Sequence, residues 1–409
     1  MNIKRVSSNN KISVAIMFGG RSVEHEISII SALQAAKYLD QTRYQSIAVY
    51  FAEDGKVYSD PKLLNKSFYT AATFQEELKK LLAIRLFANP SPKKWFSREA
   101  VENAIKADIY FPIFHGTYGE DGRVQALLEL ENVPFVGSGT TALSLAMNKH
   151  LCKQLAKTID IEVLPSLLIK KATAKSDFGG IISAIKNNQY LGQAPYFIKP
   201  NNLGSSIGAS RAFNDSEIGA NMTNIFRHDH EAIVEPCILD LMEINCAVLD
   251  DKQPIASVVE IPVASAGVLS YEDKYIRGGK GKKGGEGLKN QGANVGQNEG
   301  MAGLTRIIDP SDLDQSIKER VRQWSINLFG LLGLSGVARF DYIFDLTANK
   351  LYFNEVNPIP GSLSFYLWEK SNPSLLFPEL LDKLIEGGFR NYEINSGLQR
   401  KIEWRALKK

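Results

Sequence analysis

The first third of the chain alternates between short apolar runs and segments whose apolar side chains have helical spacing. SVAIMFGG at 13–20 is an apolar run that stops at two glycines, residues 28–39 have helical spacing, and SIAVYF at 46–51 is a second run. This order of strand, glycine turn, helix and strand is typical of a parallel α/β unit. A further buried strand, ADIYFPIF at 107–114, precedes HGTYGEDG. We expect a doubly wound α/β domain over residues 1–138, with ligand groups at the carboxyl ends of its strands.

A helix is also predicted to begin at TFQEELKKLL, because Thr73 and Glu76 have the spacing of a capping box. After residue 138 the pattern changes to that of a small mixed α+β unit. It predicts a helix over 141–157, strands near 161–170 and 196–200, and a helix near 179–188.

The remaining residues are typical of an antiparallel sheet with one long helix. The predicted strands are EAIVEPC at 231–237, MEINCAVLD at 242–250 and PIASVVEIP at 254–262. A glycine-rich stretch follows them and precedes a helix over 311–330. GVARFDYIFD at 336–345 and KLYFNEVNP at 350–358 predict a hairpin whose turn is LTAN.

Composition and charge limit the classes of protein that fit this pattern. The chain has 409 residues, 44% hydrophobic and 23% charged, so we expect a globular protein of two or three domains. A net charge of +3, from 48 Lys and Arg against 45 Asp and Glu, is too balanced for binding nucleic acid or a membrane surface. No apolar run reaches the roughly 20 residues of a membrane span, and the first residues do not predict a signal peptide. Three cysteines without CxxC spacing fit a cytoplasmic location.

The predicted hairpin carries polar side chains at spacings that suit a metal ion. Alternation along a strand places Arg339 and Asp341 on one face, and Glu355 and Asn357 on one face. With the turn centred at 347–348, Asp341 and Glu355 lie nearly opposite each other. Two carboxylates and an amide oxygen suit a hard cation such as Mg²⁺. A solvated polar face on an edge hairpin is the alternative, and the hairpin alone leaves both hypotheses open.

A second candidate site is the turn in FIKPNNLGSSIGAS at 197–210. Here a buried strand carries Lys199 at its end, and glycines and serines follow. Backbone N–H groups, hydroxyls and an ammonium group are what a polyphosphate requires. Walker A spacing occurs nowhere in the chain, and an ordinary Gly/Ser turn is an equally good interpretation.

Two polar clusters follow strands of the N-terminal domain and are candidates for substrate contacts. Glu24, His25 and Glu26 lie at a strand-to-helix turn in FGGRSVEHEIS, and His115 follows the strand at 107–114. Glu26 is equally explained as a first-turn carboxylate that complements the helix dipole. A lone histidine is more often a structural hydrogen-bonding group than a functional one.

The stretch SYEDKYIRGGKGKKGGEGLKNQG at 270–292 places Lys274 and Tyr275 before glycines, lysines and amides that have little to pack. The chain thus combines a hairpin with candidate metal ligands, which we call the metal hairpin, and a candidate phosphate-binding turn without Walker A spacing. It also has a loop rich in glycine and lysine, and scattered lysines such as Lys149. This combination indicates nucleotide-dependent chemistry on a small substrate.

Six motifs, in order along almost the whole chain, carry a resemblance to a known family. They are GGRSVEHEIS, HGTYGEDGRVQALLELENVPFVGSGTTALSLAMNK, KPNNLGSSIG, YEDKY, ARFDYIF and NEVNPIPG. With them the chain resembles the D-alanine–D-alanine ligases of the ATP-grasp superfamily. The resemblance implies a homodimer whose chain has an N-terminal doubly wound (pre-ATP-grasp) domain followed by a two-domain ATP-grasp fold. The implied domains are 1–138, 139–234 and 235–409, the last with a lid loop at 270–303.

The resemblance also implies a reaction and its ligands. ATP phosphorylates the carboxylate of a first D-alanine, and the amine of a second attacks the acyl phosphate. The product, D-alanyl-D-alanine, is a building block of peptidoglycan. The implied ATP contacts are Lys149, Lys199, Ser206, Glu235, Glu243 and Lys274. By the same resemblance Asp341, Glu355 and Asn357 hold two Mg²⁺ or Mn²⁺ ions.

The remaining implied residues act on the substrates. Glu24, Ser205 and Tyr275 resemble a hydrogen-bonded trio that links the N-terminal domain, the central domain and the lid. Glu24 would hold the amino group of the first D-alanine. Further along the substrate, His115 would lie near its carboxylate. Arg339 and the backbone N–H of Gly361 resemble the groups that stabilise the oxyanion. A lid that closes here would keep water from the acyl phosphate.

The chain departs from the family pattern after Gly361, in SLSFYLWEKS. Tyr366 falls where the family usually has a small hydroxyl residue at the second substrate's carboxylate. D-Serine, D-lactate or another amino acid therefore stay alternatives as second substrate, although Tyr275 favours an amine nucleophile. Asn148 replaces a frequent aspartate, with little consequence expected, and residues 278–300 are longer than usual.

A nucleotide-binding module without catalysis is the hypothesis from another class. It predicts a missing metal ligand or a missing oxyanion arginine, and the sequence contains all of these residues. Nucleotide binding without release of phosphate would favour it.

Overall fold

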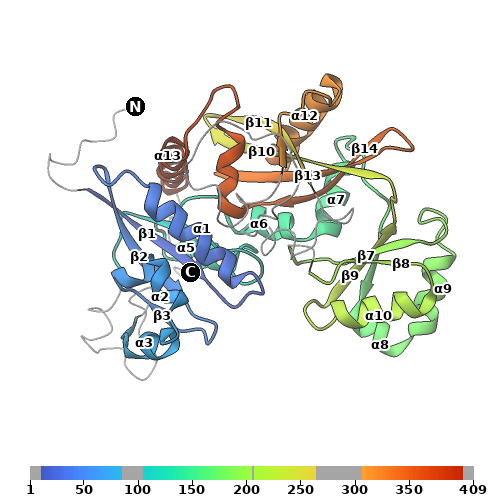
Figure 1. The fold of residues 1–409 in the computed structure, drawn as a ribbon, viewed down its shortest axis with the longest axis horizontal. Helices are drawn as coiled ribbons and strands as arrows, with labels where there is room; N and C mark the ends of the chain where they lie inside the picture. Colours follow the sequence, from blue (N-terminus) through green and yellow to red (C-terminus); the bar gives the residue numbers. More distant parts are fainter. Residues whose placement is uncertain (1–10, 85–104, 205–206, 264–305, 399–409) are drawn as a thin grey trace, which may run out of the picture.

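The computed structural model describes residues 11–84, 105–204, 207–263 and 306–398. Its described strands form two sheets of five strands and one of four. The N-terminal sheet lies at the left of Figure 1 in blue, and the small green unit with α8, α9 and α10 lies at the lower right. No described helix combines the length and the apolar character that a membrane span requires.

The N-terminal sheet has the predicted parallel arrangement in its β2-β1-β5 part, while β3 and β4 add an antiparallel edge. Its order is β4-β3-β2-β1-β5, and β1 pairs in parallel with both β2 and β5. The strands are β1 (Ile12–Gly19), β2 (Tyr44–Phe51), β3 (Val57–Tyr58), β4 (Ala83–Ile84) and β5 (Ile109–Pro112). Four short elements connect or flank them: η1 (Pro61–Leu64), α2 (Lys66–Thr70), α3 (Phe74–Lys80) and α5 (Arg123–Leu130).

Helices cover both faces of this sheet. On one face α1 (His25–Tyr38) and α13 (Phe377–Ser396) share an apolar core with β1, and on the other α5 does so. At the end of β1, Gly19 has φ +92°, and a Cβ there would lie 2.3 Å from the carbonyl oxygen of Phe51. Only glycine allows the chain to turn so closely past β2. This turn leads directly to Glu24.

The four-stranded sheet has the order β6-β9-β7-β8 and a separate apolar core. Its elements are β6 (Leu167–Lys170), α8 (Lys171–Ser176), α9 (Phe178–Lys186), β7 (Tyr196–Pro200), β8 (Ser210–Ala212), α10 (Asp215–Ile225) and β9 (Glu231–Pro236). Alternation along β7 buries Ile198 in this core and turns Lys199 to the opposite face. Strand β9 pairs with β7 and brings Glu235 opposite Phe197.

The C-terminal sheet has the order β12-β11-β10-β13-β14, with every pair antiparallel. The elements are β10 (Leu241–Asp251), β11 (Gln253–Pro262), β12 (Arg306–Ile308), α12 (Gln315–Leu331), β13 (Val337–Asp345), β14 (Lys350–Asn357) and η4 (Gly361–Leu367). One face packs on α12, α6 (Thr140–Met147) and α7 (Lys149–Lys157) around Phe340 and Phe353. The other face carries Arg339 and Asp341, as alternation requires.

The single helix predicted over 141–157 is wrong, because the structure divides it into α6 and α7. Asn148, with φ −86° and ψ 96°, leaves the helical conformation, and its side chain accepts a hydrogen bond from the Leu151 N–H at 2.9 Å. Asparagine is a good N-cap residue, so the chain starts a second helix here. The break places Lys149 in the first turn of α7.

Two other local predictions also differ from the structure. The strand expected over 161–170 is reduced to β6, because Val163 forms an isolated bridge with Phe353 of the other sheet. Helix α3 begins after Thr73 as predicted, but the Thr73 side chain makes no cap hydrogen bond. The expected capping box is therefore not formed.

Candidate active site

In the β13–β14 hairpin Asp341 lies opposite Glu355 and Arg339 opposite Asn357, close to the predicted register, which a β-bulge between Asp341 and Tyr342 shifts by one residue. Arg339 binds Asp341 through two parallel bonds, Nε to Oδ1 and Nη2 to Oδ2, each 2.7 Å long. Asn357 Nδ2 donates to the same Oδ2 at 2.9 Å. Arg339 is 4% exposed and Asp341 8%, so this ion pair is shielded from solvent and strongly oriented.

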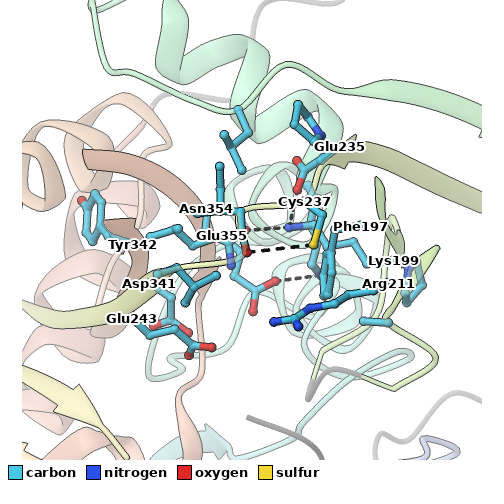
Figure 2. A pocket seen from close by; sticks show the side chains of 18 of the residues that line it. Phe197, Lys199, Arg211, Glu235, Cys237, Glu243, Asp341, Tyr342, Asn354 and Glu355 are labelled. Atoms are coloured by element: carbon cyan, nitrogen blue, oxygen red, sulfur yellow. Dashed lines mark hydrogen bonds and ion pairs between the residues drawn. The ribbon is translucent and has the colours of Figure 1, made fainter. Parts of the chain in front are cut away.

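Glu355 faces a pocket between the C-terminal sheet and the four-stranded sheet (Figure 2). The pocket has a volume of about 870 Å³ including its open mouth. Lys149 Nζ lies 3.3 Å from Glu355 Oε2. One wall is apolar and includes Phe197 and Leu241, while lysines and carboxylates line the other parts. An apolar wall next to paired charges suits a ligand with a flat ring and a phosphate chain.

Two buried lysines hold Glu235 at the back of this pocket. Lys199 Nζ lies 3.0 Å from Glu235 Oε2 and donates to Asn354 Oδ1 at 2.6 Å. Lys153 pairs with Glu235 Oε1. Burial lowers the pKa of Lys153 to about 8, although the nearby charge of Glu235 acts to raise it. Burial would raise the pKa of Glu235, but the two lysines outweigh it and lower that pKa.

Lys153 was not predicted from the sequence, although its spacing was a usable signal. Lys153 follows Lys149 by four residues on α7, so both side chains lie on one face of that helix. Glu243, on β10, also lines the pocket and is labelled in Figure 2 near Asp341. The structure therefore brings six of the predicted ATP and metal residues to one pocket: Lys149, Lys199, Glu235, Glu243, Asp341 and Glu355.

The N-terminal domain contributes a second group of buried side chains. Glu24, 4% exposed, has Oε2 2.7 Å from the Cβ position of Gly116 and 3.0 Å from that of Gly204, so it packs closely against both glycines, and Gly116, with φ +76°, favours glycine for its backbone as well. Glu120 accepts hydrogen bonds from the Gly116 N–H at 2.8 Å and from the Ile359 N–H at 3.0 Å. Glu120 therefore ties the N-terminal domain to the chain just after the metal hairpin. Its role was not predicted from HGTYGEDG.

His115 makes the second link between the same two parts of the chain. Its Nε2 is 2.9 Å from Ser31 Oγ, which also accepts the Ser362 N–H at 3.1 Å. Burial lowers the pKa of His115 to about 4, so the imidazole is neutral at pH 7. A neutral histidine can donate a hydrogen bond to a substrate but supplies no positive charge. The bridging Ser31 has no signal in the sequence beyond its place on the inner face of α1.

The turn η4 follows the hairpin and begins at Gly361. Ser362, Leu363 and Ser364 have φ between 51° and 53°, a left-handed conformation that non-glycine residues seldom adopt. The turn is buried and leads to Tyr366, which is 8% exposed. The Tyr366 hydroxyl donates to Glu260 Oε1 at 3.3 Å. Left-handed backbone in three successive buried residues is the kind of strain that functional sites retain.

Four of the predicted site residues lie outside the part of the chain that the structure describes. They are Ser205, Ser206, Lys274 and Tyr275. The predicted lid loop at 270–303 lies outside it as well. Gly204, which precedes Ser205, is described and lies against Glu24.

Models of two protein families match the chain. The model described as D-ala D-ala ligase N-terminus matches residues 13–138, and that described as D-ala D-ala ligase C-terminus matches 155–284 and 298–386. The chain belongs to the D-alanine–D-alanine ligase family. This identification confirms the resemblance inferred from the motifs. The C-terminal family model does not match residues 285–297, which lie in the glycine-rich stretch.

Curated relatives and solved structures match this chain over nearly its full length. The D-alanine–D-alanine ligase of Chloroherpeton thalassium is 31% identical over 394 residues, 94% of this chain and 98% of that protein. A D-alanine–D-alanine ligase structure from Coxiella burnetii has a TM-score of 0.71 at 26% identity, covering 94% of this chain and 97% of that one. The VanG D-Ala:D-Ser ligase of Enterococcus faecalis has a TM-score of 0.69 at 27% identity, covering 93% of this chain and 100% of that one. The confirmed fold is thus the one found in this ligase family.

The donor atoms at the hairpin fit the metal ions that the resemblance implies. Within the described ranges no three His, Cys, Asp or Glu side chains gather as a metal site. Asp341 and Glu355 are instead directly opposite each other, and Asn357 adds an amide group beside Asp341. All-oxygen donors of this kind suit Mg²⁺ or Mn²⁺, which also take ligands from phosphates and water.

We expect Glu120 to make stability depend on pH. Burial and then the charge of Glu24 raise the pKa of Glu120 to about 8. Because the folded pKa exceeds the unfolded one, the native state binds the extra proton between about pH 4.5 and pH 8. The contribution is therefore complete at acid pH and is lost as the pH rises through 8. Each unit of pKa shift corresponds to about 1.4 kcal/mol, so several kcal/mol are expected across the window.

The measurement is the free energy of unfolding by denaturant at pH 5, 6.5 and 8. Glu120→Gln should flatten the fall in stability between pH 5 and pH 8 relative to the parent. Glu129→Gln, which removes a carboxylate bonded to Thr140 at the surface, is the matched control and should keep the parent's slope. Equal slopes in the parent and Glu120→Gln would show that Glu120 does not titrate in this window.

Proposed function

We propose that this chain joins two D-alanines into D-alanyl-D-alanine at the expense of ATP, through an acyl phosphate, for peptidoglycan precursors. The observation that carries the proposal is the position of the Arg339–Asp341 pair. Asp341 lines the pocket of Lys149 and Lys199, and its partner Arg339 is close enough to the buried His115 of the N-terminal domain to interact with it electrostatically. Membership in the ligase family supports the same activity and its dependence on ATP.

In this proposal the pocket residues bind the nucleotide. Lys149 and Lys199 neutralise phosphate oxygens. To do so, Lys149 gives up its ion pair with Glu355, and Lys199 gives up its ion pair with Glu235. Glu243 accepts from the ribose hydroxyls, and the apolar wall covers the base. Asp341, Glu355 and Asn357 would hold two Mg²⁺ or Mn²⁺ ions, which when bound neutralise charge on the transferred phosphoryl group.

The residues on the substrate side orient the two D-alanines. Glu24 holds the first amino group, and the neutral His115 donates to its carboxylate. Arg339 and the Gly361 N–H are aimed at the oxygen that becomes negative when the second amine attacks. Ser205, Ser206, Lys274 and Tyr275 keep the roles that the resemblance implies.

The proposal also includes the domain boundaries, the oligomeric state and the cellular location. The domains divide at residues 138 and 234, with the last carrying the loop 270–303, and two chains form a homodimer. No nucleic acid or membrane takes part, and the enzyme acts in the cytoplasm. Helices α6 and α7 fall in the central range by sequence but pack on β14, so they connect the two ATP-grasp units.

A different second substrate is the alternative function, and one contact favours it. The Tyr366 hydroxyl donates to Glu260, so the second substrate's carboxylate needs another donor than a small hydroxyl at this position. One of the similar solved structures is a D-Ala:D-Ser ligase. D-Serine, D-lactate and other amino acids are therefore tested together with D-alanine.

The deciding experiment measures phosphate release from Mg·ATP with D-alanine alone and then with D-alanine plus each acceptor, with products identified by mass. Formation of D-alanyl-D-alanine from D-alanine alone is the expected result. Turnover that requires another acceptor would keep the mechanism and change the product. Nucleotide binding without phosphate release under every condition would favour a binding module.

A further inference from the structure

A cluster of four buried side chains extends the polar face of the C-terminal sheet beyond the metal hairpin. We call it the Arg306 cluster: Arg306, Glu260, Tyr366 and Asn245. Arg306 Nη1 donates to Glu260 Oε2 at 2.9 Å, and its guanidinium carbon lies 3.7 Å from the centre of the Tyr366 ring. Tyr366 and Asn245 Nδ2 both donate to Glu260 Oε1, each at 3.3 Å. Glu260 is 1% exposed.

The strand register places this cluster beside the reacting groups. Asn245 is the cross-strand partner of both Glu260 and Asp341, and Asp341 is the partner of Glu355. One polar row therefore runs across four strands, from Glu260 to the metal hairpin. Arg339 lies close enough to interact electrostatically with Tyr366 and Arg306.

Two sides of Arg339 face the nucleotide pocket and the N-terminal domain, so a third side remains for the second substrate. The nucleotide pocket lies on the side of Lys149, and the groups of the N-terminal domain approach through Ser362 and Ile359. The Arg306 cluster occupies the third side, over β11 and β12. A nucleophile that attacks an acyl phosphate at Arg339 has to come from a direction that neither ATP nor the first substrate uses.

The chemistry of the cluster suits a carboxylate. A guanidinium has five N–H donors, so it can bind one carboxylate of the protein and a second from a ligand at the same time. Glu260 and the stacked ring of Tyr366 fix the plane of Arg306, which lowers the entropy lost on binding. Asn245 Oδ1 is buried and has no hydrogen-bond partner among the described residues, so it is an acceptor suited to an amine. A carboxylate and an amine are the two ends of an amino acid.

We propose that Arg306 binds the carboxylate of the second substrate and so selects a free amino acid as the acceptor. Glu260 and Tyr366 are positioning residues, since they orient Arg306. Tyr366 therefore acts through its ring and not as the hydroxyl donor to the carboxylate. This inference rests on the proposed ligase function and adds the residue that determines acceptor choice.

The test is a competition between two acceptors in one reaction. D-Alaninamide has the amine of D-alanine but lacks the carboxylate, so it can accept the acyl group and cannot supply it. Enzyme, Mg·ATP, D-alanine and excess D-alaninamide are incubated together, and the ratio of dipeptide to dipeptide amide is measured by mass. This ratio does not depend on the amount of active enzyme. The parent should favour D-alanine strongly, and Arg306→Gln should lower the ratio at least tenfold.

Further variants separate binding from positioning and from folding. Arg306→Lys should recover part of the ratio, since it retains the charge without the planar fork. Tyr366→Phe keeps the stacked ring and should stay within about twofold of the parent, whereas Glu260→Gln should lower the ratio. Arg390→Gln, which removes an arginine paired with Asp250 away from the site, is the matched control and should leave the ratio unchanged.

The outcomes distinguish this inference from the proposed function. If the parent makes neither product, the joining of two D-alanines fails, and binding of the D-alanine carboxylate at Arg306 fails with it. If the parent makes dipeptide and Arg306→Gln has the parent's ratio, the function stands and the assignment of Arg306 is wrong. If Tyr366→Phe lowers the ratio as much as Arg306→Gln, the tyrosine hydroxyl and not Arg306 recognises the carboxylate.

Discussion

Replacing Arg339 with lysine is expected to lower kcat by a factor of about 10² to 10³, the usual effect of removing one donor to a developing oxyanion. The guanidinium binds both oxygens of Asp341 through Nε and Nη2 at 2.7 Å. This fixes its plane before the substrate arrives. Lysine keeps the positive charge, so Asp341 remains paired, but a single ammonium cannot reproduce the planar orientation. The affinity for ADP should change less than threefold, since the loss concerns the transition state.

The measurement is kcat at saturating ATP and D-alanine, with ADP affinity measured by calorimetry. Arg390→Lys is the control, because Arg390 also pairs with an aspartate, Asp250 at 3.2 Å, in a more exposed position outside the site. It should keep the parent's kcat. If Arg339→Lys also kept it while folded, Arg339 would be only a structural partner of Asp341.

The register of the β13–β14 hairpin could be predicted to within one residue. Alternation fixes which side chains share a face, and the length of the turn brings Asp341 near Glu355. A β-bulge between Asp341 and Tyr342, which has no signal in the sequence, shifts the register by one residue and places Glu355 directly opposite Asp341. The start of the N-terminal domain was predictable for a similar reason, since an apolar run that ends at Gly19 and Gly20 before a helical pattern has few other solutions.

The Arg306 cluster could not be predicted, because its contacts depend on the order of strands in the sheet. Arg306 and Glu260 are 46 residues apart, and Tyr366 and Glu260 are 106 apart. Nothing local in the sequence states that β12 pairs with β11 or that η4 folds over them. Tyr366 was identified by its departure from the family motif, but its contacts with Glu260 and Arg306 were not predicted. These contacts give Tyr366 a positioning role in place of direct contact with the substrate.

Buried pairing also explains why the lysines of the proposed nucleotide pocket were only partly recognised from the sequence. Lys149 and Lys199 lie in motifs, whereas Lys153 is an unremarkable helical residue until Glu235 is placed against it. The break of the predicted helix at Asn148 has the same origin. Helical spacing of apolar residues continues through this position, and the N-cap hydrogen bond that starts α7 has too small a signal in the sequence to compete with that pattern.

Replacing Asp341 with asparagine should abolish turnover, with kcat at least about 10³-fold lower, and should also lower the free energy of unfolding by about 3 kcal/mol. A metal ion contributes several kcal/mol of charge stabilisation in the transition state, and Asp341 is one of its two proposed carboxylates. The stability cost follows from Arg339, which is 4% exposed and would keep a buried charge without its carboxylate. The two effects have separate causes, so they are measured separately.

Denaturant unfolding with and without Mg·ADP separates them. The parent should gain stability from the ligand by mass action, while Asp341→Asn should gain much less at the same concentrations. Asp250→Asn, which breaks the more exposed pair with Arg390, should cost about 1 kcal/mol or less and retain both activity and the gain from Mg·ADP. A variant Asp341→Asn that loses stability but keeps the Mg·ADP gain and its kcat would place Asp341 in the structure of the hairpin and outside the metal site.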